Sequence, residues 1–322
     1  MICLIKKICL AALVFAAAGT SAAEKVLLCC DASLAQGGSA IFSGARDAAA
    51  DFAKISNTNF EFDFSMKSGE GEFVEALEKA YLGGYYGAVI YPPRGAGKAL
   101  LGKLAQLRRA GFPVAVLGRR FQAEDAVCRI STDSSAARGM LERALGRRGA
   151  AAKAACYFPS RRRASVDCDS GELGDYLPET ISPEDFRAVF AGKILAAEAF
   201  DFYSTYAEEN KIEIMRRDAF GEVFLSPSLL ANMAPIKPDS DRKYAICVGG
   251  LPLLEYYLAS GQITDCVYDD FYGWGVLAFR ELFAARSGGA RADKARVLQV
   301  KPIYVSAQNY AIFLADWRKW LK

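Results

Sequence analysis

Hydrophobic and polar positions along the chain follow two periods in turn. Short, continuous apolar runs predict strands that are buried on both faces of a parallel sheet. Apolar residues at i, i+3 and i+4 predict amphipathic helices between these runs. In the first half, strands are expected at Lys25–Cys30, Phe60–Phe64, Gly87–Tyr91 and Phe112–Leu117, and helices at Ser39–Lys54, Glu70–Leu82 and Lys98–Ala110. This alternation predicts a doubly wound parallel sheet with right-handed crossovers.

The second half repeats the same rhythm. Helices are expected at Ser135–Leu145, Glu184–Ala191, Phe202–Arg217, Leu251–Ala259, Trp274–Ala285 and Tyr310–Leu321, with another from Ser228; strands are expected at Ala154–Phe158, Ile194–Phe200, Glu222–Leu225, Tyr244–Val248, Val297–Val300 and Ile303–Val305. The last two strands are predicted as a pair broken at Pro302, and the stretch 160–182 is polar and irregular. The pattern therefore predicts an α/β fold with two lobes.

Composition limits the function more than the fold. The 322 residues are 52% apolar and 24% charged, and this length suits two packed lobes of roughly 100–150 residues each. The net charge of +3 is small, which argues against a nucleic-acid partner. The absence of histidine excludes Ser-His-Asp and Cys-His catalysis and every His-ligated metal site. Residues 93–99 contain only part of a phosphate-loop motif, because its first glycine is missing and Ala99 replaces the Ser or Thr. We predict no enzyme activity, no metal and no cofactor.

The N-terminus predicts export. Lys6 and Lys7 precede an apolar run of about a dozen residues, and small residues follow, which is typical of a signal peptide over residues 1–23 that is cleaved near Ala23. An uncleaved N-terminal anchor is the alternative. Seven cysteines follow this segment, and an odd number cannot pair fully within one chain. We expect buried free thiols in the apolar runs, with a disulfide that involves Cys168 as the alternative.

Several segments, in order and at suitable spacing, resemble the ribose- and galactose-binding family of periplasmic proteins, the type I periplasmic binding proteins. The resemblance extends over nearly all of residues 25–309, and 160–182 fits it worst. It is carried by Gly44–Ala49, Ala110–Leu117, Ile130–Gly139, Gly261–Val267 with Gly273–Ala278, and Pro302–Val305 with Asn309.

The resemblance implies two lobes joined by a hinge of three strands, with a ligand held in the cleft between them. The chain would cross near Thr132-Asp133, near Asp269-Asp270 and near Pro302-Ile303. The N-terminal lobe would then comprise 24–132 plus 270–302, and the C-terminal lobe 133–269 plus 303–322. The ligand would lie at the carboxyl ends of the strands.

The family's ligand contacts can be placed on this chain, and most have changed. The resemblance implies seven ligand-binding residues: Gln36, Ser39, Arg94, Arg119, Asp133, Ser228 and Asp269. The aromatic residues of the first loop and two acids are lost, whereas Arg119 is kept and Arg94 is gained beside Arg119 and Arg120. Guanidinium groups bind carboxylate or phosphate in a bidentate way, so one hypothesis is an anionic ligand such as a sugar acid or a phosphorylated small molecule. The alternative is that Arg94 and Arg120 are solvated surface groups.

The resemblance predicts a monomeric periplasmic solute-binding protein of an ABC importer. Such a protein captures a small polar ligand, a sugar or sugar derivative, by closing its cleft, and hands it to an inner-membrane permease. The alternative is the same fold acting as a sensor that signals to a membrane receptor kinase or chemoreceptor. The lactose-repressor type shares the lobes, but it begins with a DNA-binding helix-turn-helix where this chain has its signal-like segment.

Overall fold

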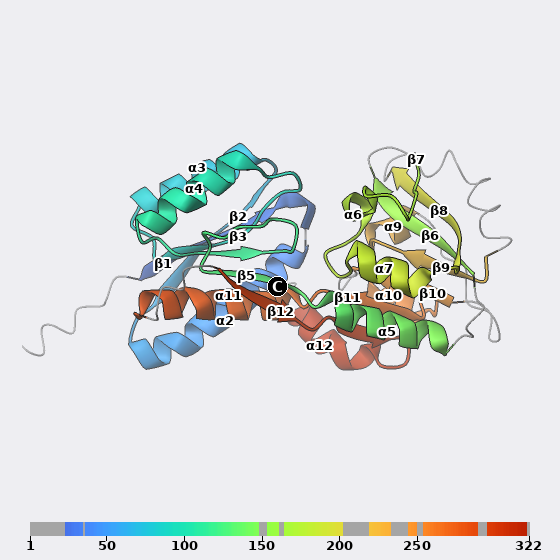
Figure 1. The fold of residues 1–322 in the computed structure, drawn as a ribbon. Coiled ribbons are helices and arrows are strands. Elements are labelled where there is room, and N and C mark those ends of the chain that lie inside the picture. Colours follow the sequence, from blue (N-terminus) through green and yellow to red (C-terminus); the bar gives the residue numbers. More distant parts are fainter. Residues whose placement is uncertain are drawn as a thin grey trace, which may run out of the picture.

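The chain folds into two α/β lobes that lie side by side (Figure 1). The computed structural model describes residues 23–34, 36–147, 153–160, 164–201, 219–232, 244–249, 254–288 and 295–320. Each lobe contains one sheet in which parallel pairing dominates, so the predicted fold class is confirmed. The predicted signal peptide lies almost entirely outside the described residues, as does the helix expected at 202–217.

The sheet of the first lobe has six strands, and all of its neighbouring strands are parallel. Their order begins at one edge with a strand from the far end of the chain and then follows the 5-4-3-1-2 order of a doubly wound sheet. In that order they are β12 (Arg296–Val300), β5 (Cys128–Thr132), β4 (Val114–Leu117), β3 (Gly87–Tyr91), β1 (Glu24–Asp31) and β2 (Phe60–Lys67).

Helices cover both faces of this sheet because alternate residues of a strand point to opposite sides. Along β1, Val26 and Leu28 pack in one core with helices α2 and α11, whereas Leu27 and Cys29 pack in another with α3 and α4. The first-lobe helices are α2 (Gln36–Ser56), α3 (Glu70–Leu82), α4 (Lys98–Arg109) and α11 (Phe271–Arg286), with a short 3-10 turn, η1, at Ala32–Leu34.

Helices α2 and α11 touch at two glycines. A Cβ atom added at Gly44 would lie 2.0 Å from the carbonyl oxygen of Tyr272, and one at Gly275 would lie 2.0 Å from that of Ile41. No side chain fits at such distances, so the glycines set how closely the two backbones approach. This contact joins a helix from the start of the chain to one more than 200 residues later.

The second lobe repeats the doubly wound order with an extra antiparallel strand at each edge. Its seven strands, from edge to edge, are β13 (Ile303–Ser306), β11 (Asp265–Tyr268), β10 (Tyr244–Val248), β9 (Gly221–Phe224), β6 (Ala154–Ser160), β8 (Ile194–Asp201) and β7 (Ala164–Ser165). Its helices are α5 (Ser134–Gly146), α6 (Leu173–Tyr176), α7 (Pro183–Phe190), α9 (Ser228–Asn232), α10 (Glu255–Ala259) and α12 (Tyr310–Trp320). Helices α5, α6 and α7 cover one face, and α9, α10 and α12 cover the other.

The chain passes between the two sheets three times: from β5 into α5, from β11 into α11, and from β12 into β13. The predicted pairing of the last two strands with each other is wrong, because β12 pairs with β5 and β13 pairs with β11. Residues 301 and 302 therefore carry the chain from one lobe to the other instead of forming a turn. The exact lobe boundaries stay a prediction.

Two further differences concern short elements. Strands β5 and β11 were not predicted as separate elements; each is only four or five residues long, and an acid, Asp133 or Asp269, follows it. Strand β7 and helix α6 lie within the stretch that the pattern left irregular. Six of the seven described cysteines are buried, as predicted, and Cys168 is half-buried. Among the described residues, no helix is long and apolar enough to cross a membrane.

Candidate functional site

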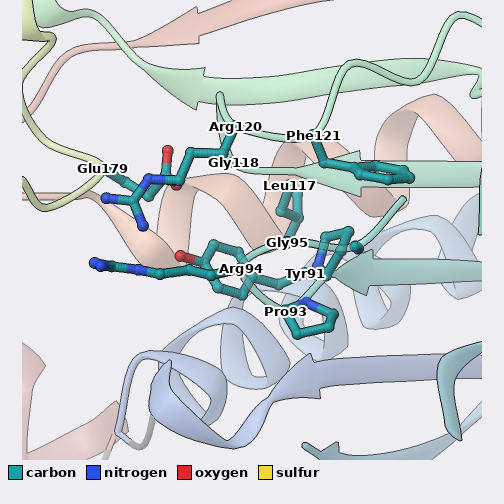
Figure 2. A pocket seen from close by; sticks show the side chains of 11 residues that line it. Tyr91, Pro93, Arg94, Gly95, Leu117, Gly118, Arg120, Phe121 and Glu179 are labelled. Atoms are coloured by element: carbon teal, nitrogen blue, oxygen red, sulfur yellow. The ribbon is translucent and has the colours of Figure 1, made fainter. Parts of the chain in front are cut away.

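Three arginines gather at the carboxyl ends of the first-lobe strands. Arg94 follows β3, and Arg119 and Arg120 follow β4. Figure 2 shows that the side chains of Arg94 and Arg120 extend in the same direction, and that Glu179 lies beside the guanidinium group of Arg120. In open α/β sheets, ligands bind at this edge, so these loops form the first half of the candidate site.

The second half is a segment of the other lobe, Gly174–Thr180, which we call the inserted segment. It follows the start of α6 and precedes α7. Its backbone carbonyl groups accept hydrogen bonds from all three arginines across the lobe boundary. Arg94 donates to the carbonyls of Asp175 and Leu177, Arg119 Nη2 donates to that of Pro178 at 3.0 Å, and Arg120 Nη2 donates to those of Gly174 and Leu177.

Glu179 provides the charge that balances part of this arginine cluster. Its side chain is only 6% exposed. One carboxylate oxygen, Oε1, lies 3.3 Å from Nε of Arg120, and the other, Oε2, accepts a hydrogen bond of 2.8 Å from the backbone amide of Arg119. Gly118 precedes that amide with a φ of 92°, a backbone conformation that residues with side chains rarely adopt. The turn after β4 thus delivers both a backbone amide and a guanidinium group to one carboxylate.

Arg119 has unused donor capacity. Its side chain is 19% exposed, and Nη1 is buried without a hydrogen-bond partner among the residues that the structure describes. Burial lowers the pKa of this guanidinium, with the charge of Glu179 opposing the shift and that of Arg120 adding to it. A buried donor without a partner costs free energy, so this atom marks a place where an acceptor from a ligand would bind favourably.

Asp269 lies at the end of β11, where the chain leaves the second sheet. The side chain accepts hydrogen bonds from the hydroxyl groups of Thr132, at the end of β5, and Thr180, in the inserted segment. The residue is 3% exposed, and burial raises the pKa of its carboxyl group to about 6. Asp269 therefore joins two of the three inter-lobe crossings to the inserted segment.

The inserted segment also contacts the second lobe's own strand ends. Gly249 follows β10, and a Cβ atom added there would lie 2.7 Å from Cβ of Pro178 and 3.7 Å from the hydroxyl of Thr180. The position has no side chain, and Pro178 occupies the space.

The space that remains between the arginines and Glu179 is small. The cavity has a volume of about 30 Å³, and Arg94, Arg120 and Glu179 are among its lining residues (Figure 2). That volume holds about one water molecule, whereas sites for small molecules measure roughly 300–1,000 Å³. A monosaccharide does not fit in this conformation.

The structure brings together three of the seven predicted site residues, namely Arg94, Arg119 and Asp269. Asp133 instead caps α5, since its carboxylate accepts from the amide of Ala136 at 3.0 Å. Ser39 lies in the first turn of α2, and Ser228 is exposed at the start of α9. Neither these two nor Asp133 lines the cavity formed by the described residues. Gln36 begins α2, and its side chain lies outside the described part. Ligand contact stays a prediction for all seven.

Sequence reasoning missed Glu179 and Thr180. Both lie in the stretch with no strand or helix period, and the resemblance is weakest there. The poor fit of this stretch was itself the available signal. A cluster of cysteine and acidic side chains suited to a metal ion is absent from the described ranges.

No protein-family model and no curated protein matches this sequence. Solved structures do match over nearly the whole chain. A periplasmic ribose ABC transporter protein from Conexibacter woesei has a TM-score of 0.67 at 16% identity, covering 95% of this chain and 100% of that one. The arabinose-binding component from Shewanella sp. ANA-3, bound to L-arabinofuranose, has a TM-score of 0.68 at 15% identity, covering 92% and 96%. A Bacillus halodurans solute-binding protein with bound myo-inositol has a TM-score of 0.65 at 13% identity, covering 92% and 99%. This chain therefore has the two-lobed fold of the type I periplasmic sugar-binding proteins.

Proposed function

We propose that this chain is an exported solute-binding protein that captures a small polar ligand, a sugar or sugar derivative, between its lobes. It would act in the periplasm as a monomer after loss of residues 1–23, and it would deliver the ligand to the permease of an ABC importer. The lobes would comprise 24–132 plus 270–302 and 133–269 plus 303–322. The proposal includes no catalytic step.

One observation carries this proposal. Three guanidinium groups and the buried carboxylate of Asp269 gather at the carboxyl ends of strands from both sheets, where ligands bind in open α/β folds. Hydroxyl groups of a sugar can both donate to Asp269 and accept from the arginines. The similarity to solved structures with bound L-arabinofuranose and myo-inositol supports a small polar ligand, and two lobes joined by a hinge can capture such a ligand by closing.

A thermal-shift screen of sugars, sugar acids, sugar phosphates and nucleosides tests this function. A ligand at 100 times its dissociation constant adds about 2.7 kcal/mol of stability. An unfolding entropy of about 0.6 kcal/mol/K for roughly 300 residues converts this to a rise in Tm of roughly 4 °C. We expect at least one compound to produce such a rise.

The arginine variant Arg119→Ala then tests the site. We expect it to weaken the binding of that compound by tenfold or more, because it removes a buried donor from the site. Arg109→Ala is the matched control, since Arg109 is exposed on α4 and contacts only the carbonyl of Ala105 among the bonds described. Equal affinity of wild type and Arg119→Ala would place the ligand elsewhere, and a panel without any binder would refute solute capture.

A further inference from the structure

The inserted segment occupies the place where a ligand would contact both lobes. It lies against the loop after β4, against Gly249 after β10, and against Asp269 after β11. These are loops at the carboxyl ends of strands from the two sheets. Each loop follows a different strand, and the inserted segment contacts all three loops.

The inserted segment offers the loops the same kinds of chemical groups that a small polar ligand would offer. Glu179 offers a carboxylate to the amide of Arg119 and the guanidinium of Arg120. Thr180 offers a hydroxyl that donates to Asp269, as a sugar hydroxyl would. The carbonyls of residues 174–178 satisfy further guanidinium donors. The chain thus supplies one anion, one hydroxyl and several neutral acceptors.

The charges indicate which ligand class can take this place. Among the described residues, Glu179 is the carboxylate in ion-pair contact with Arg119 and Arg120. Asp269 makes its described hydrogen bonds to threonine hydroxyls instead of to an arginine. The charges of Asp175 and Glu184 act on Arg94 and Arg119 more weakly than that of Glu179. Arg119 Nη1 is buried and has no partner among the described residues. The cluster therefore has capacity for an anionic group and binds its own carboxylate there.

We propose that Arg94, Arg119 and Arg120 form an anion site whose occupant in the ligand-free protein is the chain's own Glu179. This anion site, which rests on the proposed function, assigns the class of the ligand: a small polar molecule that carries a carboxylate or phosphate. The ligand's anion displaces Glu179, and the inserted segment moves out of the space between the lobes. Until then, Glu179 holds the lobes together and lowers the affinity for ligand, because the binding-competent state is only partly populated.

The test compares the wild type with Glu179→Gln, which keeps the shape and removes the charge. Glu172→Gln is the matched control, because Glu172 is an exposed acid just before the inserted segment. Calorimetric titrations use inorganic phosphate, D-gluconate and, as the neutral probe, D-ribose. Small-angle scattering gives the radius of gyration of each protein without ligand. Glu179→Ala is the second variant, and it removes the acceptor oxygens as well.

We expect Glu179→Gln to bind phosphate or gluconate roughly ten- to hundredfold more tightly than the wild type, the range expected for loss of a charged hydrogen-bond partner. Glu172→Gln should equal the wild type. The radius of gyration should increase in Glu179→Ala, because the lobes lose the carboxylate contacts with Arg119 and Arg120 and keep only the carbonyl bonds of the inserted segment. Anion affinities that are equal or weaker in Glu179→Gln would overturn the proposal.

Two other outcomes separate this proposal from the function on which it rests. If ribose binds the wild type and neither anion binds any of the proteins, the anion site is refuted and solute capture stands. If no probe and no member of the screen binds the wild type or either Glu179 variant, solute capture and the anionic ligand are refuted together. A larger radius of gyration in Glu179→Ala would then still support Glu179 as one of the contacts that hold the lobes together, and an unchanged radius would refute that role as well.

Discussion

Asp269 should make the stability of the folded protein depend on pH. It is a buried carboxyl group whose ordinary pKa of 3.8 is raised by burial to about 6, while hydrogen bonds from Thr132 and Thr180 oppose the rise. The charge of Glu179 adds to the increase, and that of Arg119 reduces it. We consider the substitution Asp269→Asn, which removes the ionisation and keeps an oxygen that can accept from one of the threonines.

The magnitude follows from the shift in pKa. A rise of the pKa from 3.8 to about 6 corresponds to about 3 kcal/mol in the free energy of unfolding. The folded protein binds the proton more tightly than the unfolded chain. The stability that this tighter proton binding contributes is therefore complete below about pH 4. It decreases as the pH rises toward 6 and is lost at pH 7. Asp269→Asn should match the wild type at pH 4 and exceed it by about 3 kcal/mol at pH 7.

Urea unfolding at pH 4, 5, 6 and 7, followed by far-ultraviolet circular dichroism, measures this difference. Taking the variant minus the wild type at each pH removes the contribution of the other titrating groups that the two proteins share. Asp51→Asn is the control, because Asp51 and its partner Lys54 are each 75% exposed, and its difference from the wild type should be nearly flat. A difference for Asp269→Asn that stays constant from pH 4 to 7, or that favours the wild type at pH 7, would refute the argument from burial.

Two more substitutions test the fold around the site. Gly44→Ala should cost about 3 kcal/mol of unfolding free energy, because its Cβ would lie 2.0 Å from the carbonyl oxygen of Tyr272. The control is Gly102→Ala in α4, which should be neutral or slightly stabilising because no atom lies within 4 Å of the added Cβ. Equal effects of the two substitutions on the free energy of unfolding would contradict the close contact. Asp133→Ala should cost about 1 kcal/mol through loss of the cap on α5 and leave ligand affinity unchanged; a loss of affinity without a loss of stability would give Asp133 the ligand role predicted for it.

The sequence pattern was sufficient for most of the fold, because burial on one or two faces imposes a local period on each strand and helix. It predicted β1 to β4 and the helices between them to within a few residues. It failed at residues 297–305, where two neighbouring apolar pieces form strands in different lobes. No local period distinguishes a turn from a crossing when a proline separates the pieces.

The local pattern was sufficient only for the arginine side of the site, whereas Asp269 was predicted from the resemblance. Arg94 and Arg119 follow apolar strands, so their place at a sheet edge can be inferred from the chain around them. Glu179 and Thr180 acquire their roles from partners 60 and 89 residues away, which no local pattern records. The local pattern also does not distinguish the roles of the adjacent Asp269 and Asp270. Asp269 is the buried acceptor at the hinge, and Asp270 caps α11 by accepting from the amide of Gly273.

The two last strands have a consequence for how the protein is made. Strand β12 completes the first sheet against β5, and β13 completes the second against β11. Until residue 306 has been synthesised, strand β11 of the nascent chain lacks its neighbour β13, and before residue 296 strand β5 also lacks β12. An unpaired strand edge is a surface for aggregation. Premature termination before Arg296 would thus damage both halves of the molecule at once instead of releasing one intact lobe.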